Sequence, residues 1–135
     1  MKMPRAMSTS VYTRLGGYDK LVRVLDGVCS RMMRHERLKI YFKGHSNASK
    51  RRLTQNFLGF VCERAGGPGV YGGPDIKAAH DGLGITSEEW DIFFNLVRET
   101  AAKQKLTATQ TDELLKLLGS SEKDIVEDGK AQSGL

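Results

Sequence analysis

Apolar residues recur every three or four positions along two long stretches of the chain, which is the spacing of one face of a helix. The first stripe predicts a helix over residues 18–34, and Gly16-Gly17 separates it from a shorter helical start over residues 11–15. The second stripe ends at Gly66-Gly67-Pro68, a sequence that stops a helix. The two stripes consist of Leu21, Val24, Leu25, Val28 and Met32, and of Leu53, Phe57, Phe60 and Val61.

Capping signals predict two further helices. Thr86 with Glu89 and Thr107 with Gln110 have the spacing of capping boxes, and Gly119 is a plausible end for the second of these helices. No segment alternates apolar and polar residues between hairpin turns, so a sheet is not expected. The sequence therefore predicts an all-α protein with four longer helices and irregular connections. The apolar residues behind the two caps are Trp90, Phe93, Leu96 and Val97, and Leu114, Leu117 and Leu118.

One histidine is framed by an unusual number of turn-forming residues. Residues 66–86, GGPGVYGGPDIKAAHDGLGIT, place five glycines and two prolines just before His80. Glycine and proline fix turns, so they constrain the direction in which the imidazole points. A histidine on an apolar helical face is more often a packed structural residue, and that interpretation stays open. The framing favours a single axial ligand to a metal held mostly by something other than the protein, which indicates a haem.

Composition limits the class of protein. The 135 residues are 39% hydrophobic, enough for one domain with a closed core. No apolar run is long enough to span a bilayer, and the basic N-terminus lacks the apolar centre of a secretory signal, so we expect no membrane association. Basic residues alternate with acidic ones along most of the chain, and the net charge of +5 predicts solubility rather than nucleic-acid binding. Cys29 and Cys62 form no CxxC pair, which disfavours structural zinc and fits a reducing cytoplasm.

The order of four motifs resembles a group I truncated haemoglobin. The motifs YTRLGGYDKL, IYFKG, AGGPGVYGG and IKAAHDGLGIT follow one another within residues 11–125. The resemblance implies a two-over-two helical sandwich around a b-type haem that is held without covalent attachment, and the absence of a CxxCH motif agrees with this. We expect a truncated globin domain over residues 11–126, between flexible segments at residues 1–10 and 127–135.

The resemblance also implies roles for residues on the proximal side. His80 is the implied iron ligand, with its other ring nitrogen donating to a backbone carbonyl. Ile76 lies one helical turn earlier on the same face and is expected to touch the porphyrin. Arg52, with Lys50 as a second candidate, is the expected partner of a haem propionate, although a solvated helix start explains these cations equally well. Other residues that the resemblance places against the haem are Phe42, Tyr71, Ile85 and Trp90.

Two aromatic residues, Trp90 and Tyr41, have alternative interpretations. A tryptophan of the core explains Trp90 as well as a haem contact does. For Tyr41, beside Phe42, we expect packing rather than ligand chemistry.

The distal side departs from the resemblance. Val28 and Cys29 stand where group I members usually have a phenylalanine–tyrosine pair, whose tyrosine hydroxyl bonds iron-bound oxygen. A thiol is a weaker donor than a phenol. A net hydrogen bond is worth about 0.5–1.5 kcal/mol, so its loss predicts oxygen retention weakened roughly tenfold. We expect Cys29 to be a small pocket-lining residue; a thiolate ligand to iron is the alternative, which burial opposes.

The register of the next helix leaves a choice open. The segment HSNASKRR is longer than is typical of the family. If the extra residues lie in that loop, the helix adopts the first of two possible registers, which places toward the haem Leu53, Asn56, Phe57 and Phe60. If the extra residues lie after the loop, the second register brings Thr54 and Gln55 close to the ligand. The spacing from Phe60 to Gly66-Gly67 supports the first register. His45 is a further candidate sixth ligand, although we expect it to be solvent-exposed.

Three functions follow from such a pocket. The first is reversible binding of O2, or of NO or CO, at a five-coordinate iron. The second is redox catalysis that oxidises NO with bound O2, which needs firm oxygen retention and a separate reductase. The third is a haem-based sensor or electron carrier. We expect a cytoplasmic monomer or weak dimer, with the first function favoured.

Overall fold

The computed structural model of the chain describes residues 9–128. Every regular element in this range is helical, which confirms the predicted all-α class. The elements are α2 (Val11–Arg14), α3 (Gly17–Arg34), the 3-10 helix η1 (Lys39–Phe42), α4 (Asn47–Arg64), α5 (Ile76–His80), α6 (Ser87–Lys103), α7 (Ala108–Gly119) and α8 (Glu122–Ile125).

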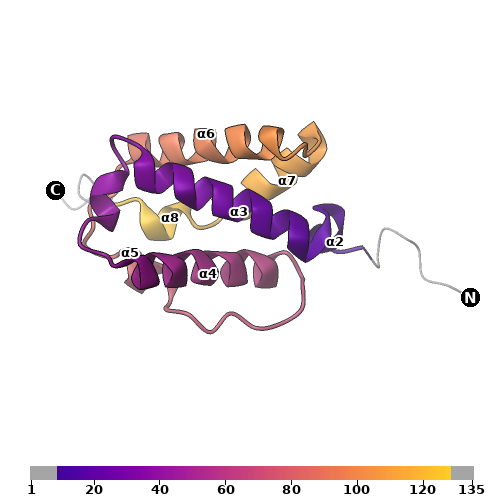
Figure 1. Cartoon of the computed structure of the whole chain (residues 1–135), viewed down its shortest axis with the longest axis horizontal. Helices are drawn as coiled ribbons and strands as arrows, with labels where there is room; N and C mark the ends of the chain where they lie inside the picture. Colours follow the sequence, from indigo (N-terminus) through magenta and orange to yellow (C-terminus); the bar gives the residue numbers. More distant parts are fainter. Residues whose placement is uncertain (1–8, 129–135) are drawn as a thin grey trace, which may run out of the picture.

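Four long helices build the frame. In Figure 1, α6 runs along the top, α4 along the bottom and α3 crosses in front of them, while α7 and α8 lie behind α3. α3 contacts α4 and α6, and α7 contacts the same two helices. This arrangement is the expected two-over-two helical sandwich. None of the helices within residues 9–128 is both long and apolar enough to cross a membrane.

The core lies where the sequence stripes meet. On α3 the predicted stripe is buried from Leu21 to Cys29, and it packs against α6 and α4. α6 approaches α3 closely at Gly27, where an added Cβ would lie 2.7 Å from the Thr100 Cγ2 atom. Other buried residues of the cluster are Leu15, Phe60, Val61, Val97, Ala101, Leu114 and Leu118.

The predicted capping boxes are both present. The Thr86 hydroxyl accepts from the Glu89 amide, and the Glu89 carboxylate accepts from the Thr86 amide, each at 3.1 Å. Thr107 and Gln110 make the same reciprocal pair at 3.1 and 2.8 Å. These local bonds fix where α6 and α7 begin, as the sequence predicted.

Contacts extend slightly beyond the predicted domain limits of residues 11 and 126. Ser10 caps α2 by accepting from the Thr13 amide at 3.2 Å. At the other end, Glu127 and Asp128 bond to the segment between α5 and α6, as described below. Both ends of the described range are therefore held by hydrogen bonds. The rest of the predicted flexible segments, residues 1–8 and 129–135, lies outside the described residues.

Candidate functional site

A cavity of about 370 Å³ lies among the helices. Its walls come from α3, η1, α4, α5, α6 and the α7–α8 region, and most of them are apolar. Cavities of this size and character hold small molecules and cofactors in other proteins. The helices therefore form a mostly apolar site with few polar groups.

Most of the predicted site residues meet at this cavity, although they come from five elements and the loops between them. Val28 and Arg52 do not line it. Val28 is fully buried in the helical core, because the α3 backbone turns its side chain away from the neighbouring Cys29. Arg52 is exposed on α4, so its role as a propionate partner stays a prediction. The predicted residues that line the cavity are Cys29, Phe42, Leu53, Asn56, Phe57, Phe60, Tyr71, Ile76, His80, Ile85 and Trp90.

The His80 imidazole has a defined tautomer. Its Nδ1 atom lies 2.7 Å from the Ile76 carbonyl oxygen, one turn earlier on α5. A carbonyl oxygen only accepts, so Nδ1 carries a proton, and in the neutral imidazole the lone pair is therefore on Nε2. The predicted hydrogen bond to a backbone carbonyl is thus present. α5 itself is short, and its start is fixed by Asp75, whose carboxylate accepts from the Ala78 amide at 3.1 Å.

The turn that follows His80 is held from the far end of the chain. Gly82 and Gly84 have φ angles of +84° and +72°, which favour glycine. The Glu127 carboxylate accepts from both of their amides, at 2.9 and 2.6 Å, and the Glu127 amide donates to the Ile85 carbonyl at 2.8 Å. Asp128 accepts from the Ser87 amide at 2.9 Å. The C-terminal segment therefore fixes the exit from the histidine-bearing helix.

Among the described residues that line the cavity, Cys29 on α3 carries the one thiol. Cys29 is 5% exposed, and burial raises the pKa of its thiol to about 11. The thiol therefore stays protonated at neutral pH, which argues against a thiolate ligand. Neither Thr54 nor Gln55 lines the cavity, whereas Asn56 does. The first of the two predicted α4 registers is the one that the structure adopts.

The cavity walls are rich in ring contacts. Trp90 lies between Phe93 and Phe94, with ring centroids 5.2 Å from each, and Phe57 packs on Phe93 at 6.2 Å. These side chains join α4 and α6 across the cavity. Tilted ring pairs of this kind add stabilisation beyond their buried area. Trp90 is thus both a core residue and a wall of the cavity, and its contact with a haem stays a prediction.

Tyr71 forms another wall of the cavity. Its ring stands edge-on to Phe60 at 5.6 Å. Its hydroxyl donates to the Pro74 carbonyl at 2.7 Å, which ties together the glycine-rich segment before α5. An added Cβ at Gly73 would lie 2.5 Å from that hydroxyl, so the tyrosine needs glycine there. The glycines that frame His80 therefore also make room for a wall of the cavity.

His45 also lies at the cavity, on the loop between η1 and α4. It is exposed, as expected, and its Nδ1 atom lies 2.7 Å from the Ser49 hydroxyl. The structure thus places it at the cavity mouth.

One buried polar cluster was not predicted as part of the site. The Tyr41 hydroxyl donates to Glu89, which also accepts from the Thr86 amide and, at 3.3 Å, from Arg37. Burial alone would raise the pKa of Glu89, but these donors lower it below its ordinary value. Burial and the bond to Glu89 raise the pKa of Tyr41 to about 12. A charged carboxylate therefore links η1 to the start of α6 at the cavity wall, and the expected packing role of Tyr41 includes this bond.

The comparisons with known proteins agree with this fold. The Bacterial-like globin family profile matches residues 10–127. The "Group 1 truncated hemoglobin GlbN" of Mycolicibacterium paratuberculosis is 31% identical over 65% of this chain, which spans 62% of that protein's length. Its namesake from a Nostoc species is 30% identical over 78% of this chain and 86% of its own. One solved structure is a 2/2 haemoglobin from a Synechococcus species with covalently attached haem. It matches this chain with a TM-score of 0.77 and 20% sequence identity, over 88% of this chain and 99% of the Synechococcus chain.

The chain therefore belongs to the bacterial-like globin family, whose members bind haem and, through it, diatomic gases. Its similarity within that family is to the group 1 truncated haemoglobins.

The Tyr41–Glu89 bond generates a prediction about stability. The variant Tyr41→Phe removes one donor from a buried carboxylate, so we expect the free energy of unfolding at pH 7 to fall by about 1–3 kcal/mol. The lowered pKa of folded Glu89 means that its contribution is complete above about pH 4.3, the ordinary glutamate value, and is lost as pH falls through the folded value. The gap between variant and wild type should therefore narrow as the pH falls below that ordinary value. Urea denaturation followed by circular dichroism measures both.

Tyr18→Phe is the matched control, because Tyr18 is 54% exposed and makes no comparable bond in the described part of the chain. It should change the free energy of unfolding by less than about 0.5 kcal/mol. An equal loss in both variants, or a gap that persists in acid, would contradict the role assigned to the charged carboxylate.

Proposed function

We propose that this protein binds a b-type haem without covalent attachment, with His80 as the protein ligand of the iron, and that it binds O2 or another diatomic gas reversibly. The observation that carries the proposal is the apolar cavity with a histidine whose Nε2 lone pair is free, since Nδ1 is committed to Ile76. Neutral imidazole nitrogen is a ligand that haem iron takes in globins. When bound, the haem supplies the iron at which the gas is held.

The residues of the cavity fit that group. Ile76 shares the face of His80, and Phe42 and Trp90 offer flat apolar walls for a macrocycle. The bond from Nδ1 orients the imidazole and makes Nε2 a better ligand. At the surface, Arg52 is our proposed propionate partner, with Lys50 as the second candidate. A cytoplasmic location and a monomer or weak dimer remain predictions from the sequence.

The distal wall favours reversible binding over NO oxidation. Of Cys29, Asn56 and Phe57, the expected distal residues that line the cavity, Cys29 and Asn56 carry side-chain hydrogen-bond donors. A further donor, His45, lies exposed on the loop before α4. The thiol is a weak donor, and its raised pKa keeps it neutral. Bound O2 is polar and gains from a strong donor, whereas CO gains little. Weak distal donors therefore lower O2 retention relative to CO, and NO oxidation requires O2 to be retained.

The haem assignment is tested by absorption spectra of the purified protein after haem addition, in the ferric, ferrous and CO-bound forms. We expect a Soret band in each form, and a changed ferrous spectrum with much weaker haem retention in His80→Ala. His35→Ala is the control, because His35 does not line the cavity, and its spectra should match those of wild type. No Soret band, or unchanged spectra in His80→Ala, would overturn the proposal.

Covalent attachment is tested on the same samples. Extraction with acidified organic solvent should remove all of the haem from the polypeptide. Haem that stays with the polypeptide would show covalent attachment, as in the Synechococcus structure, and would overturn that part of the proposal alone.

The distal assignment predicts the effect of adding a phenol. Cys29→Tyr should slow O2 dissociation about two- to tenfold relative to Cys29→Phe, because the two variants differ only in the hydroxyl and one such bond is worth about 0.5–1.5 kcal/mol. CO dissociation should differ by less than about twofold between them, because CO gains little from the same donor. Stopped-flow ligand displacement measures both rates. Equal O2 dissociation rates in the two variants would contradict the claim that the distal wall lacks a donor as strong as a phenol.

A further inference from the structure

The positive charge of this protein is concentrated in one segment. Residues 37–62 contain six lysines and arginines and no aspartate or glutamate. The whole chain has 21 basic and 16 acidic residues, so the other 109 residues hold 15 basic and 16 acidic ones, a net charge of −1. The net charge of +5 therefore comes from this segment. The six cations are Arg37, Lys39, Lys43, Lys50, Arg51 and Arg52.

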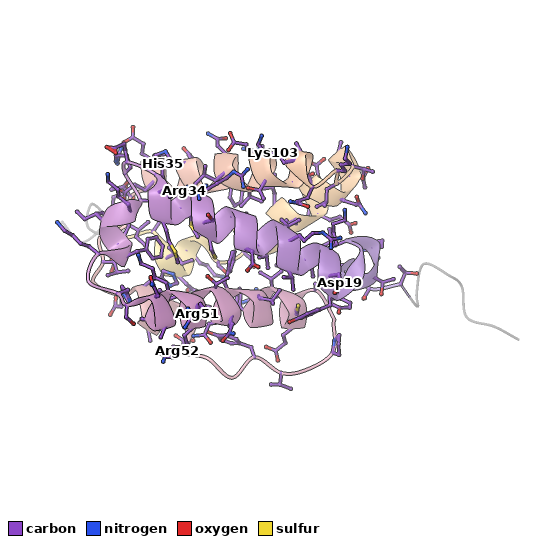
Figure 2. The ribbon with its side chains drawn as sticks, in the orientation of Figure 1. Asp19, Arg34, His35, Arg51, Arg52 and Lys103 are labelled. Atoms are coloured by element: carbon purple, nitrogen blue, oxygen red, sulfur yellow. The ribbon has the colours of Figure 1, made fainter. Side chains whose placement is uncertain are left out.

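The same segment forms one side of the cavity. It contains η1 and most of α4, which supply Tyr41, Phe42, Leu53, Asn56 and Phe57 to the wall. Several of its apolar side chains line the cavity, whereas none of its six cations does. Figure 2 shows Arg51 and Arg52 on α4, at the lower edge of the view, and Lys103 on α6 at the top.

Two of these cations are available to a partner. Lys43 and Arg51 are exposed, and within residues 9–128 neither of them makes an ion pair. By contrast, Arg37 pairs with Glu88 at 2.7 Å, and Arg52 is the proposed partner of a haem propionate. We call Ile40, Lys43 and Arg51 the basic rim.

The basic rim includes one exposed apolar residue, which shares its segment of the chain with the two cations. Ile40 is 63% exposed on η1, directly before the two cavity residues Tyr41 and Phe42. An apolar contact bordered by charges is typical of protein–protein interfaces. Sites for single-stranded nucleic acid instead present exposed aromatic rings to the bases, and Tyr41 and Phe42 are half-buried. The composition of the basic rim favours a protein partner.

We propose that the basic rim docks an acidic one-electron carrier protein of the flavodoxin or ferredoxin class. The inference rests on the proposed function, because such a carrier serves to return an oxidised haem protein to its ferrous form. In that exchange the carrier loses one electron and the globin gains one, with no bond made or broken. Opposite charges speed the encounter and set its orientation. The partner's contact would lie on the outer side of the cavity wall, so the electron has only that wall to cross.

Binding of a purified, fluorescently labelled acidic flavodoxin to the haem-loaded protein tests the proposal. The affinity should fall at least about tenfold between ~20 mM and ~300 mM ionic strength. Lys43→Glu/Arg51→Glu should weaken binding about tenfold at low salt. Arg52 and Lys50 are left intact, because they are the proposed propionate partners.

Lys103→Glu/Lys116→Glu is the matched control. It changes the net charge by the same four units at exposed positions of α6 and α7, outside the basic rim. It should weaken binding less than about twofold. The rate at which reduced flavodoxin reduces the ferric protein should fall in Lys43→Glu/Arg51→Glu and change little in the control. The rate of reduction by photoreduced riboflavin, a small donor with no docking surface, should be equal in wild type and in both variants.

Each contrary outcome has a distinct meaning. An equal loss of affinity for flavodoxin in both variants, or binding that salt does not weaken, would overturn the proposed docking at the basic rim. The proposed function would still stand if the protein gave a normal Soret band. Tighter binding of a short DNA duplex than of flavodoxin at the same salt concentration would make the surface a nucleic-acid site and overturn the proposal. A protein that gives no Soret band would overturn the proposed function and the docking inference together.

Discussion

The direction of the His80 imidazole is the constraint on which the rest of the site depends. Before the ring, Asp75 caps α5 and the Ile76 carbonyl holds Nδ1 at 2.7 Å. After it, Glu127 holds the amides of two left-handed glycines. α5 has only five residues, too few for a stable isolated helix. Its position therefore comes from these anchors, and the four-helix sandwich supplies the walls around the ring that they fix.

The elements that depend on residues close together in the chain could be predicted from the sequence. The α3 stripe, the two capping boxes and the glycine-framed His80 each follow from residues a few positions apart, and all are present in the structure. The prediction of a pocket depended on the resemblance to a known family, and most of the residues that this resemblance implies line one cavity.

The interactions that the sequence did not reveal join distant segments. The sequence indicates Glu89 only as half of a capping box, whereas in the structure Glu89 also accepts a hydrogen bond from Tyr41, 48 positions away. The sequence predicts a flexible segment at Glu127, whereas the Glu127 carboxylate accepts from the amides of Gly82 and Gly84, 45 and 43 positions away. No local pattern signals such a pair. The excess of cations in residues 37–62 is visible in the sequence, but its meaning depends on the cavity behind it.

The most direct test of the central claim is the iron–ligand vibration of the ferrous protein in resonance Raman spectra. In His80→Gly protein supplied with free imidazole, the account predicts a band that shifts when the free imidazole carries 15N. It predicts no shift when the remaining histidines, His35 and His45, are labelled instead. A band that follows labelling of the protein's own histidines in that variant would contradict His80 as the ligand of the iron.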